Sequence, residues 1–222
     1  MEDDQDIAAI LKKGRWFGSL PAALQDLIIE RAVFKSYEKG DYIVREGRAP
    51  KAMHAVLSGK VRVTRQVGAE RKEVPIQLGE PGFWCGDYAV FAGANSIGSI
   101  IADTPVTTLA LSVAQFERIV REEPGHFRAF AGLLFERYAD MFRYLGESHG
   151  LAREEWLRTR LADLAAVMRR DNPASDAGVI TLSQSELAAM MGMSRQTLNT
   201  LLSRLEARGL ISVGFRSIRV SN

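Results

Sequence analysis

The chain has 222 residues, of which 46% are hydrophobic and 25% are charged, and its formal net charge is +2. This length suits one large or two modest domains, and the composition is that of a soluble globular protein. So small a net charge identifies no partner, although the charge is unevenly distributed. Residues 152–222 hold 10 arginines and 7 acidic residues, whereas residues 1–151 hold 19 basic and 20 acidic residues.

Several classes of protein are unlike this sequence. No apolar run approaches the ~20 residues of a membrane-spanning helix, and the acidic start is not a signal peptide, so we expect a cytoplasmic protein without a membrane partner. The single cysteine, Cys85, excludes an intrachain disulfide and an iron–sulfur cluster, which needs about four thiolates. His54, His126 and His149 have no zinc-ligand spacing, and no P-loop, GxSxG or HExxH motif is present. We expect neither a metal site nor an enzyme.

The first half of the chain changes from helical to strand-like patterning. A short helix is predicted around residues 7–11 and another over 21–33, with Pro21 as its first residue. Residues 34–112 then contain short alternating apolar runs broken by glycine-containing turns. The runs cover residues 42–44, 53–57, 60–65, 73–78, 97–102 and 106–111. Short strands at near-regular spacing predict an antiparallel barrel or sandwich.

A long helix is predicted over residues 124–151. Its apolar side chains fall on an a/d repeat that Arg137 and Ser148 interrupt, and such a seam can pack against its twin in a two-stranded coil. The seam consists of Phe127, Phe130, Leu134, Met141, Tyr144 and Leu151. The alternative is a helix that covers the strands of its own chain, with the aromatic residues as intrachain core.

The long helix is followed by a candidate hinge at residues 147–156, where Gly150 weakens helical structure. The next helix is predicted over 153–170 and has an apolar face of leucines and Val167. Residues 171–178 have the composition of a surface loop.

Residues 182–210 are typical of two short helices around a tight turn. Ser183 and Glu186 form a capping box for the first helix, and Gly192 lies where the chain bends sharply. The second helix begins after Ser194, a capping residue. Its inward face consists of Leu198, Leu201, Leu202 and Leu205.

The outward face of this second helix carries Arg195, Gln196, Asn199 and Thr200. Arginine, glutamine and asparagine match base edges in the major groove, and a helix-turn-helix places them at the start of its second helix. The alternating residues 211–220 that follow predict a β-hairpin, which makes the motif a winged helix-turn-helix. The alternative is an ordinary helical hairpin with a polar face.

Glu46-Gly47 and the segments 53–63 and 78–91 resemble the cyclic-nucleotide-binding β-roll of the CRP/FNR family, to which the bacterial cyclic-AMP receptor protein belongs. The resemblance implies an α+β fold with an N-terminal cyclic-nucleotide-binding-like β-roll of the double-stranded jelly-roll type, a long dimerisation helix and a C-terminal winged helix-turn-helix. The corresponding boundaries are 1–123, 124–151 and 152–222. It also implies a homodimer that binds a palindromic site in double-stranded DNA, with half-sites ~34 Å apart.

The resemblance places an effector pocket near Gly86. Nucleotide-binding members have a phosphate-binding cassette that runs from a Gly-Glu pair to an Arg-Ser or Arg-Thr pair. Here Gly86-Asp87 matches the first pair, but residues 95–99 contain no arginine, and a buried phosphate without a cation is costly. We therefore expect that cyclic AMP is not the effector. The candidate pocket residues are Gly86, Asp87, Tyr88, Ala89, Ser96, Ser99, Tyr138, Met141 and Phe142.

Three alternatives remain for this pocket. Its own side chains fill it, and DNA binding then needs no effector. It accepts a less charged or larger ligand. Or it resembles the haem sensors of the family, with Cys85 or a histidine as axial ligand, although a small buried cysteine and surface histidines are the simpler interpretation.

The resemblance also assigns DNA contacts. Arg195, Gln196 and Thr200 correspond to positions that read or flank bases, and glutamine in place of the usual glutamate predicts a different half-site. Phosphate contacts are assigned to Ser183, Gln184, Ser185 and Arg216. Together with these, the expected contacts include Ser194, Thr197 and Asn199. In resembling activators the loop at 171–178 touches RNA polymerase, a further candidate partner, although a plain linker is the alternative. The competing function is a cyclic-nucleotide or haem sensor that controls a partner protein and not DNA.

Overall fold

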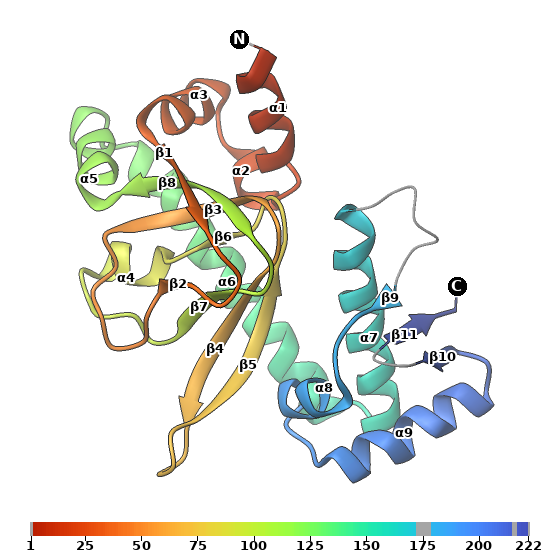
Figure 1. Ribbon diagram of the computed structural model, residues 1–222. Coiled ribbons are helices and arrows are strands. Elements are labelled where there is room, and N and C mark those ends of the chain that lie inside the picture. Colours follow the sequence, from red (N-terminus) through yellow and green to blue (C-terminus); the bar gives the residue numbers. More distant parts are fainter. Residues whose placement is uncertain (1, 172–178, 215–216, 222) are drawn as a thin grey trace. The chain divides into compact units, whose positions relative to one another are not determined.

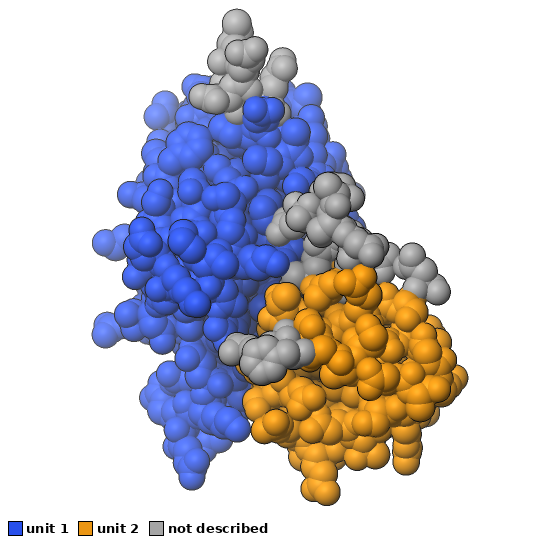
Figure 2. Space-filling view, turned by 45° about the vertical axis from the view of Figure 1, so that its right-hand side comes forward, with its two compact units in different colours: residues 1–139 blue, residues 140–222 orange. Residues whose placement is uncertain are grey.

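The computed structural model describes residues 2–171, 179–214 and 217–221 (Figure 1). The chain forms two compact units, residues 1–139 and 140–222 (Figure 2). The boundary falls inside the long helix α6 (His126–Gly150), which therefore belongs to both units. Most of the predicted loop at 171–178, where the resemblance suggested a polymerase contact, lies outside the described residues.

The first unit contains the predicted antiparallel β-roll, which is confirmed. Two four-stranded sheets form it (Figure 1). The first sheet has the order β1 (Val33–Tyr37), β8 (Val106–Ser112), β3 (Ala52–Ser58) and β6 (Trp84–Cys85). The second has the order β2 (Tyr42–Val44), β7 (Ser99–Ala102), β4 (Val61–Val67) and β5 (Lys72–Gly79). Strand β3 is buried from Ala52 to Leu57, and these residues are apolar except for His54.

Helices cover this roll. Those of the first unit are α1 (Glu2–Leu11), α2 (Arg15–Ser19), α3 (Ala22–Arg31), α4 (Asp87–Ala92), α5 (Val113–Glu122) and the first half of α6. The sequence did not predict α2, α4 or α5. Pro21 is the N-cap of α3, so the helix begins at Ala22, one residue after the start that we predicted.

An aromatic cluster forms the centre of the first unit's core. Trp16 meets Trp84 edge-on at 5.1 Å between ring centroids, and Phe17 stacks on Trp84 at 5.9 Å. Phe130 of α6 is completely buried among these rings, 5.8 Å from Trp16 and 5.0 Å from Phe116. This packing joins helices, strands and α6 into one apolar core.

The buried position of Phe130 corrects the predicted dimer seam. Phe130 is intrachain core, and Tyr144 contacts Trp156 edge-on at 5.7 Å. The exposed apolar side of α6 keeps Phe127, Leu134 and Met141 of the predicted seam, but Leu145 takes the place of Tyr144, and Tyr138 that of Arg137. It consists of Phe127, Leu134, Phe135, Tyr138, Met141, Phe142 and Leu145, of which Leu134 is half-buried. Two a/d seams share positions 127, 134 and 141, and hydrophobicity alone does not distinguish them.

The second unit is a winged helix-turn-helix, as predicted. Its elements after α6 are α7 (Arg153–Asp171), β9 (Val179–Ile180), α8 (Gln184–Met190), α9 (Arg195–Ala207), β10 (Ile211–Gly214) and β11 (Ser217–Val220). Strands β10 and β11 form the predicted hairpin, and β9 adds an unpredicted third strand to β11. Leu157 and Leu161 of α7 and Leu198 of α9 are completely buried in this unit.

Candidate nucleic-acid interface and effector pocket

Local capping interactions fix the ends of both helices of the helix-turn-helix. The Ser183 side chain accepts a hydrogen bond from the Glu186 backbone N–H, and the Glu186 carboxylate accepts one from the Ser183 backbone N–H. This confirms the predicted capping box. Gly192 has a φ of 58°, a left-handed conformation that side chains disfavour, and it allows the tight turn. Ser194 then caps α9 by accepting a hydrogen bond from Thr197 N–H at 3.0 Å.

The apolar and polar sides of α9 are sharply separated. Leu198, Leu201, Leu202 and Leu205 are buried, as predicted. The opposite side forms the wall of an open groove of about 590 Å³, lined by Arg195, Gln196, Asn199, Thr200 and Ser203. The predicted base-reading residues therefore share one accessible surface, which we call the α9 face.

Three polar side chains of the α9 face have unsatisfied hydrogen-bonding groups among the residues that the structure describes. Arg195 and Gln196 are exposed, and neither side chain forms a hydrogen bond or ion pair with another described residue. Asn199 is half-buried, and its Oδ1 is buried without a hydrogen-bond partner in the described part of the chain. An unsatisfied buried polar atom costs free energy, whereas the exposed groups of Arg195 and Gln196 are accessible to an external partner. The hydroxyls of Thr197 and Thr200 are instead engaged locally, with Ser194 and with the Gln196 carbonyl.

Two residues at this surface were missed in the sequence. Ser203 belongs to the α9 face, and Arg204 lines an adjoining groove with Gln196, Thr197 and Thr200. Both follow Asn199 and Thr200 by four residues, which places them one turn further along the same side of a helix. The helical repeat was thus a sufficient signal for both.

The candidate phosphate contacts are only partly accessible for that role. Ser185 is exposed and Gln184 is half-buried at the start of α8, whereas the Ser183 hydroxyl already donates to Glu186 at 2.6 Å. Arg216 lies outside the described residues.

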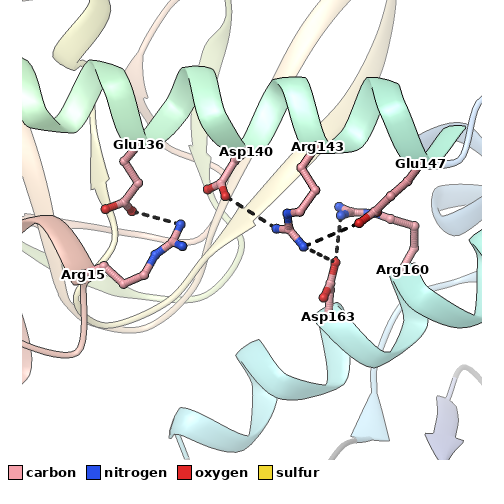
Figure 3. Close-up of polar contacts among 7 residues, drawn as sticks. All are labelled: Arg15, Glu136, Asp140, Arg143, Glu147, Arg160 and Asp163. Atoms are coloured by element: carbon pink, nitrogen blue, oxygen red, sulfur yellow. Dashed lines mark hydrogen bonds and ion pairs between the residues drawn. The ribbon is translucent and has the colours of Figure 1, made fainter.

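Several arginines of the second unit serve the fold. Arg143 and Arg160 share Asp163 at 3.5 and 3.0 Å, which joins the end of α6 to α7 (Figure 3). Arg208 pairs with Glu154 at 2.5 Å. The arginine content of residues 152–222 is therefore not in itself a measure of DNA contacts, and the unpaired Arg195 and Arg204 are more informative.

The cassette begins at a tight turn before α4. Gly86 has a φ of 80°, and a Cβ atom there would lie 3.0 Å from the Ala52 carbonyl oxygen, so the position requires glycine. Asp87 follows as the first residue of α4 and is 8% exposed. Burial raises the pKa of Asp87, and the nearby Arg137 partly opposes this rise.

The expectation that no cation accompanies the cassette was wrong. Arg137, which interrupts the predicted seam of α6, reaches the cassette from the first unit's part of that helix. Its Nε lies 3.9 Å from Asp87 Oδ2, and its Nη2 donates a hydrogen bond to the Trp84 carbonyl at 2.5 Å. Its guanidinium also lies 4.8 Å from the centre of the Phe83 ring. A cation therefore does lie beside Asp87, and it comes from a residue 50 positions further along the chain.

The other candidate pocket residues do not form a set of available polar groups around Asp87. Ser99 is buried and accepts a hydrogen bond from Glu46 N–H at 3.0 Å, and Ser96 donates one to the Gly98 carbonyl at 2.7 Å. Tyr88 is 46% exposed on α4, and the side chain of Ala89 lies outside the description. The α6 candidates Tyr138, Met141 and Phe142 are more than half exposed.

The haem alternative finds little support in the geometry of the donors. Cys85 is buried beside its cross-strand neighbour His54, and burial raises the pKa of its thiol to about 12. Burial lowers the pKa of His54 to about 4, and its Nδ1 is 3.1 Å from the Thr108 hydroxyl. Among the described residues no group of three histidines, cysteines or acids is arranged to hold a metal ion. Within the same residues no helix is long and apolar enough to cross a membrane.

Comparison with known proteins gives matches to both units. The family model of the cyclic nucleotide-binding domain matches residues 34–123, and that of the Crp-like helix-turn-helix domain matches residues 157–222. The chain is 28% identical over 110 residues to the human potassium/sodium hyperpolarization-activated cyclic nucleotide-gated channel 2, but it covers only 12% of that channel.

Other matches extend over almost the whole chain. The HTH-type transcriptional regulator Cmr of Mycobacterium tuberculosis is 26% identical over 208 residues, which cover 92% of this chain and 80% of Cmr. Among solved structures, the c-di-GMP responsive global regulator CLP of Xanthomonas campestris aligns with a TM-score of 0.71 at 18% identity. This alignment covers 91% of this chain and 100% of CLP.

Proposed function

The chain belongs to the CRP/FNR family of transcription regulators, and we propose that it binds a palindromic DNA site as a homodimer in the cytoplasm, without enzymatic activity of its own. The observation that carries this proposal is the α9 face. Arg195 and Gln196 are exposed and form no hydrogen bond or ion pair with other described residues, and Asn199 lines the same groove, on the helix that a winged helix-turn-helix inserts into the major groove.

The exposed side of α6 supports the homodimer. Phe127, Leu134 and Met141 repeat every seven residues, and exposed aromatic residues flank them. An apolar stripe of this kind is costly in water and is buried when two copies form a parallel coil. Two reading helices in one dimer then recognise two half-sites, which a single α9 cannot.

We further propose that the effector is not cyclic AMP, or that no effector is needed. The residues that correspond to the second half of the cassette contain no arginine, and the Ser96 and Ser99 hydroxyls already have intrachain partners. An incoming cyclic phosphate would lack the charge-assisted hydrogen bonds that normally repay its desolvation.

The test begins with selection of genomic DNA fragments by the purified chain. We expect a two-fold symmetric sequence to be enriched, and fluorescence anisotropy should show binding to it at least ~1000-fold tighter than to random duplex. Failure to enrich any sequence would favour the sensor that controls a partner protein. Sedimentation provides the second measurement, because Met141→Glu should yield monomers and lose operator binding while Glu117→Gln on α5 should change neither.

A further inference from the structure

Arg137 has an unusual position in the first unit. It lies on the inner side of α6, its side chain is 27% exposed, and three different groups surround its guanidinium. These groups are a carboxylate, a backbone carbonyl and an aromatic ring, and all belong to residues 83–87. One side chain of α6 therefore holds the whole segment that leads into α4.

The shape of the guanidinium suits this arrangement. Its donors lie in one plane and point in fixed directions, and its face stacks on an aromatic ring. Here one edge faces the Trp84 carbonyl and Asp87, while the ring of Phe83 supports the group. A lysine ammonium would keep the charge, but it has no planar fork to meet the carbonyl and carboxylate together.

The charges of the cassette are balanced within the chain. Asp87 has an 11% exposed side chain, and a buried carboxylate without a cation is strongly disfavoured. Arg137 supplies that cation. A ligand's anionic group that approached this point would meet a carboxylate and would have to displace Arg137 from two existing partners.

We propose that Arg137 is a built-in substitute for a cassette ligand: it clamps α4 and β6 onto α6 and so makes operator binding independent of an anionic effector. The inference rests on the proposed DNA-binding function. Helix α6 continues without interruption from Arg137 to Gly150, so a change in how its first half is held can reach the second unit. Arg137 acts here as a positioning residue and does not touch DNA.

The experiment measures operator affinity by anisotropy for the wild-type chain, Arg137→Ala and Arg137→Lys, each with and without millimolar cyclic AMP. We expect no response of the wild type to cyclic AMP. We expect Arg137→Ala to bind the operator about tenfold more weakly, a usual size for coupling between sites, with unchanged affinity for random duplex. Arg137→Lys should recover only part of the loss because the ion pair returns without the fork.

Two further variants separate this role from simple destabilisation. Arg137→Gln combined with Asp87→Asn removes both charges and keeps similar side-chain shapes, and it should lose as much operator affinity as Arg137→Ala, because residues of one pair are not additive. Arg15→Ala is the matched control, since it also removes an arginine that pairs with an acidic residue of α6, Glu136, at 3.5 Å (Figure 3). It should bind the operator like the wild type.

The inference is overturned if Arg137→Ala binds the operator as tightly as the wild type, or if cyclic AMP strengthens wild-type binding. It is also overturned if the charge-free pair, melting at the wild-type temperature, retains full operator affinity. Failure of the proposed function looks different, because the wild-type chain would then not distinguish any operator from random duplex.

Discussion

The α9 face and the cassette use similar polar residues in opposite ways. On α9, Arg195 and Gln196 are exposed and form no hydrogen bond or ion pair with other described residues. In the cassette, Asp87 and Ser99 are buried and have intrachain partners. The first site leaves its hydrogen-bonding capacity for an external partner, whereas the second uses it within the fold. Whether a polar side chain already has an intrachain hydrogen-bond or ion-pair partner, more than its residue type, indicates where a ligand binds.

The largest expected effect tests whether the side of α6 that carries Phe130 is packed into the core of the first unit. Phe130→Ala should lower the free energy of unfolding by about 3–5 kcal/mol, because it leaves a cavity among buried rings. Urea denaturation followed by tryptophan fluorescence measures this loss. Phe34→Ala, at a 60% exposed position of β1, is the matched control and should change stability by less than about 0.5 kcal/mol. If Phe130→Ala lowered the free energy of unfolding only slightly, Phe130 would instead be a residue of the dimer seam, as the sequence suggested.

The next effect tests whether the α9 face is open to DNA. Arg195→Ala should weaken operator binding by about 1–3 kcal/mol and relax specificity at one base position, because a bidentate contact to guanine is lost. Anisotropy with single-base operator variants measures it. Arg118→Ala on α5 removes another exposed arginine and should leave binding unchanged. Equal weakening on operator and random duplex would contradict a base-reading role for Arg195.

A third prediction concerns His54, the buried cross-strand neighbour of Cys85. The pKa of His54 is about 4 in the folded chain against an ordinary 6.5, because burial disfavours its charged form. Between these pH values the unfolded chain binds one more proton, so the contribution of His54 to stability is complete above pH 6.5 and falls as the pH approaches 4.

Denaturation at several pH values measures this contribution. The wild-type chain should lose roughly 2 kcal/mol more stability than His54→Asn between the ordinary histidine pKa and pH ~5. Asparagine keeps a hydrogen-bonding group toward Thr108 and does not titrate. Parallel pH profiles for the two proteins would show that His54 is not held neutral in the folded chain.

The smallest effect concerns Arg204, which lines the groove that adjoins the α9 face. Arg204→Ala should weaken binding to operator and random duplex alike and should reduce the slope of log K against log salt by about 1, as expected for one phosphate contact. Arg208→Ala is the comparison, because Arg208 pairs with Glu154 and should leave the slope unchanged. An unchanged slope for Arg204→Ala would restrict the DNA contacts to the first turns of α9.

The sequence predicted most reliably what depends on near neighbours in the chain. The capping box at Ser183 and Glu186, the turn at Gly192 and the leucines of α9 follow from spacings of three and four residues, and all three are confirmed. An antiparallel barrel or sandwich was also predictable, because its strands are short, regular and separated by glycine turns, and the family resemblance specified a β-roll.

The contact of Arg137 with Asp87 was not predictable in the same way. It joins residues 50 positions apart and depends on which side of α6 meets the roll. The pattern of α6 allowed two seams, and only the packing of Phe130 against Trp16 and Phe116 decides between them. Ser203 and Arg204 were different, since extending the helical repeat of Thr200 by one turn was enough to find them.

The burial of Cys85 has a practical consequence. Cys85 is the chain's single cysteine, and because its thiol is buried and burial raises its pKa, we expect it to react slowly with maleimides and other alkylating reagents. A cysteine introduced on the surface of α9 or α6 can therefore carry a fluorophore or spin label without removal of Cys85. Distances measured between such labels would report the movements of both units in solution, and the core around Cys85 would keep its native residues.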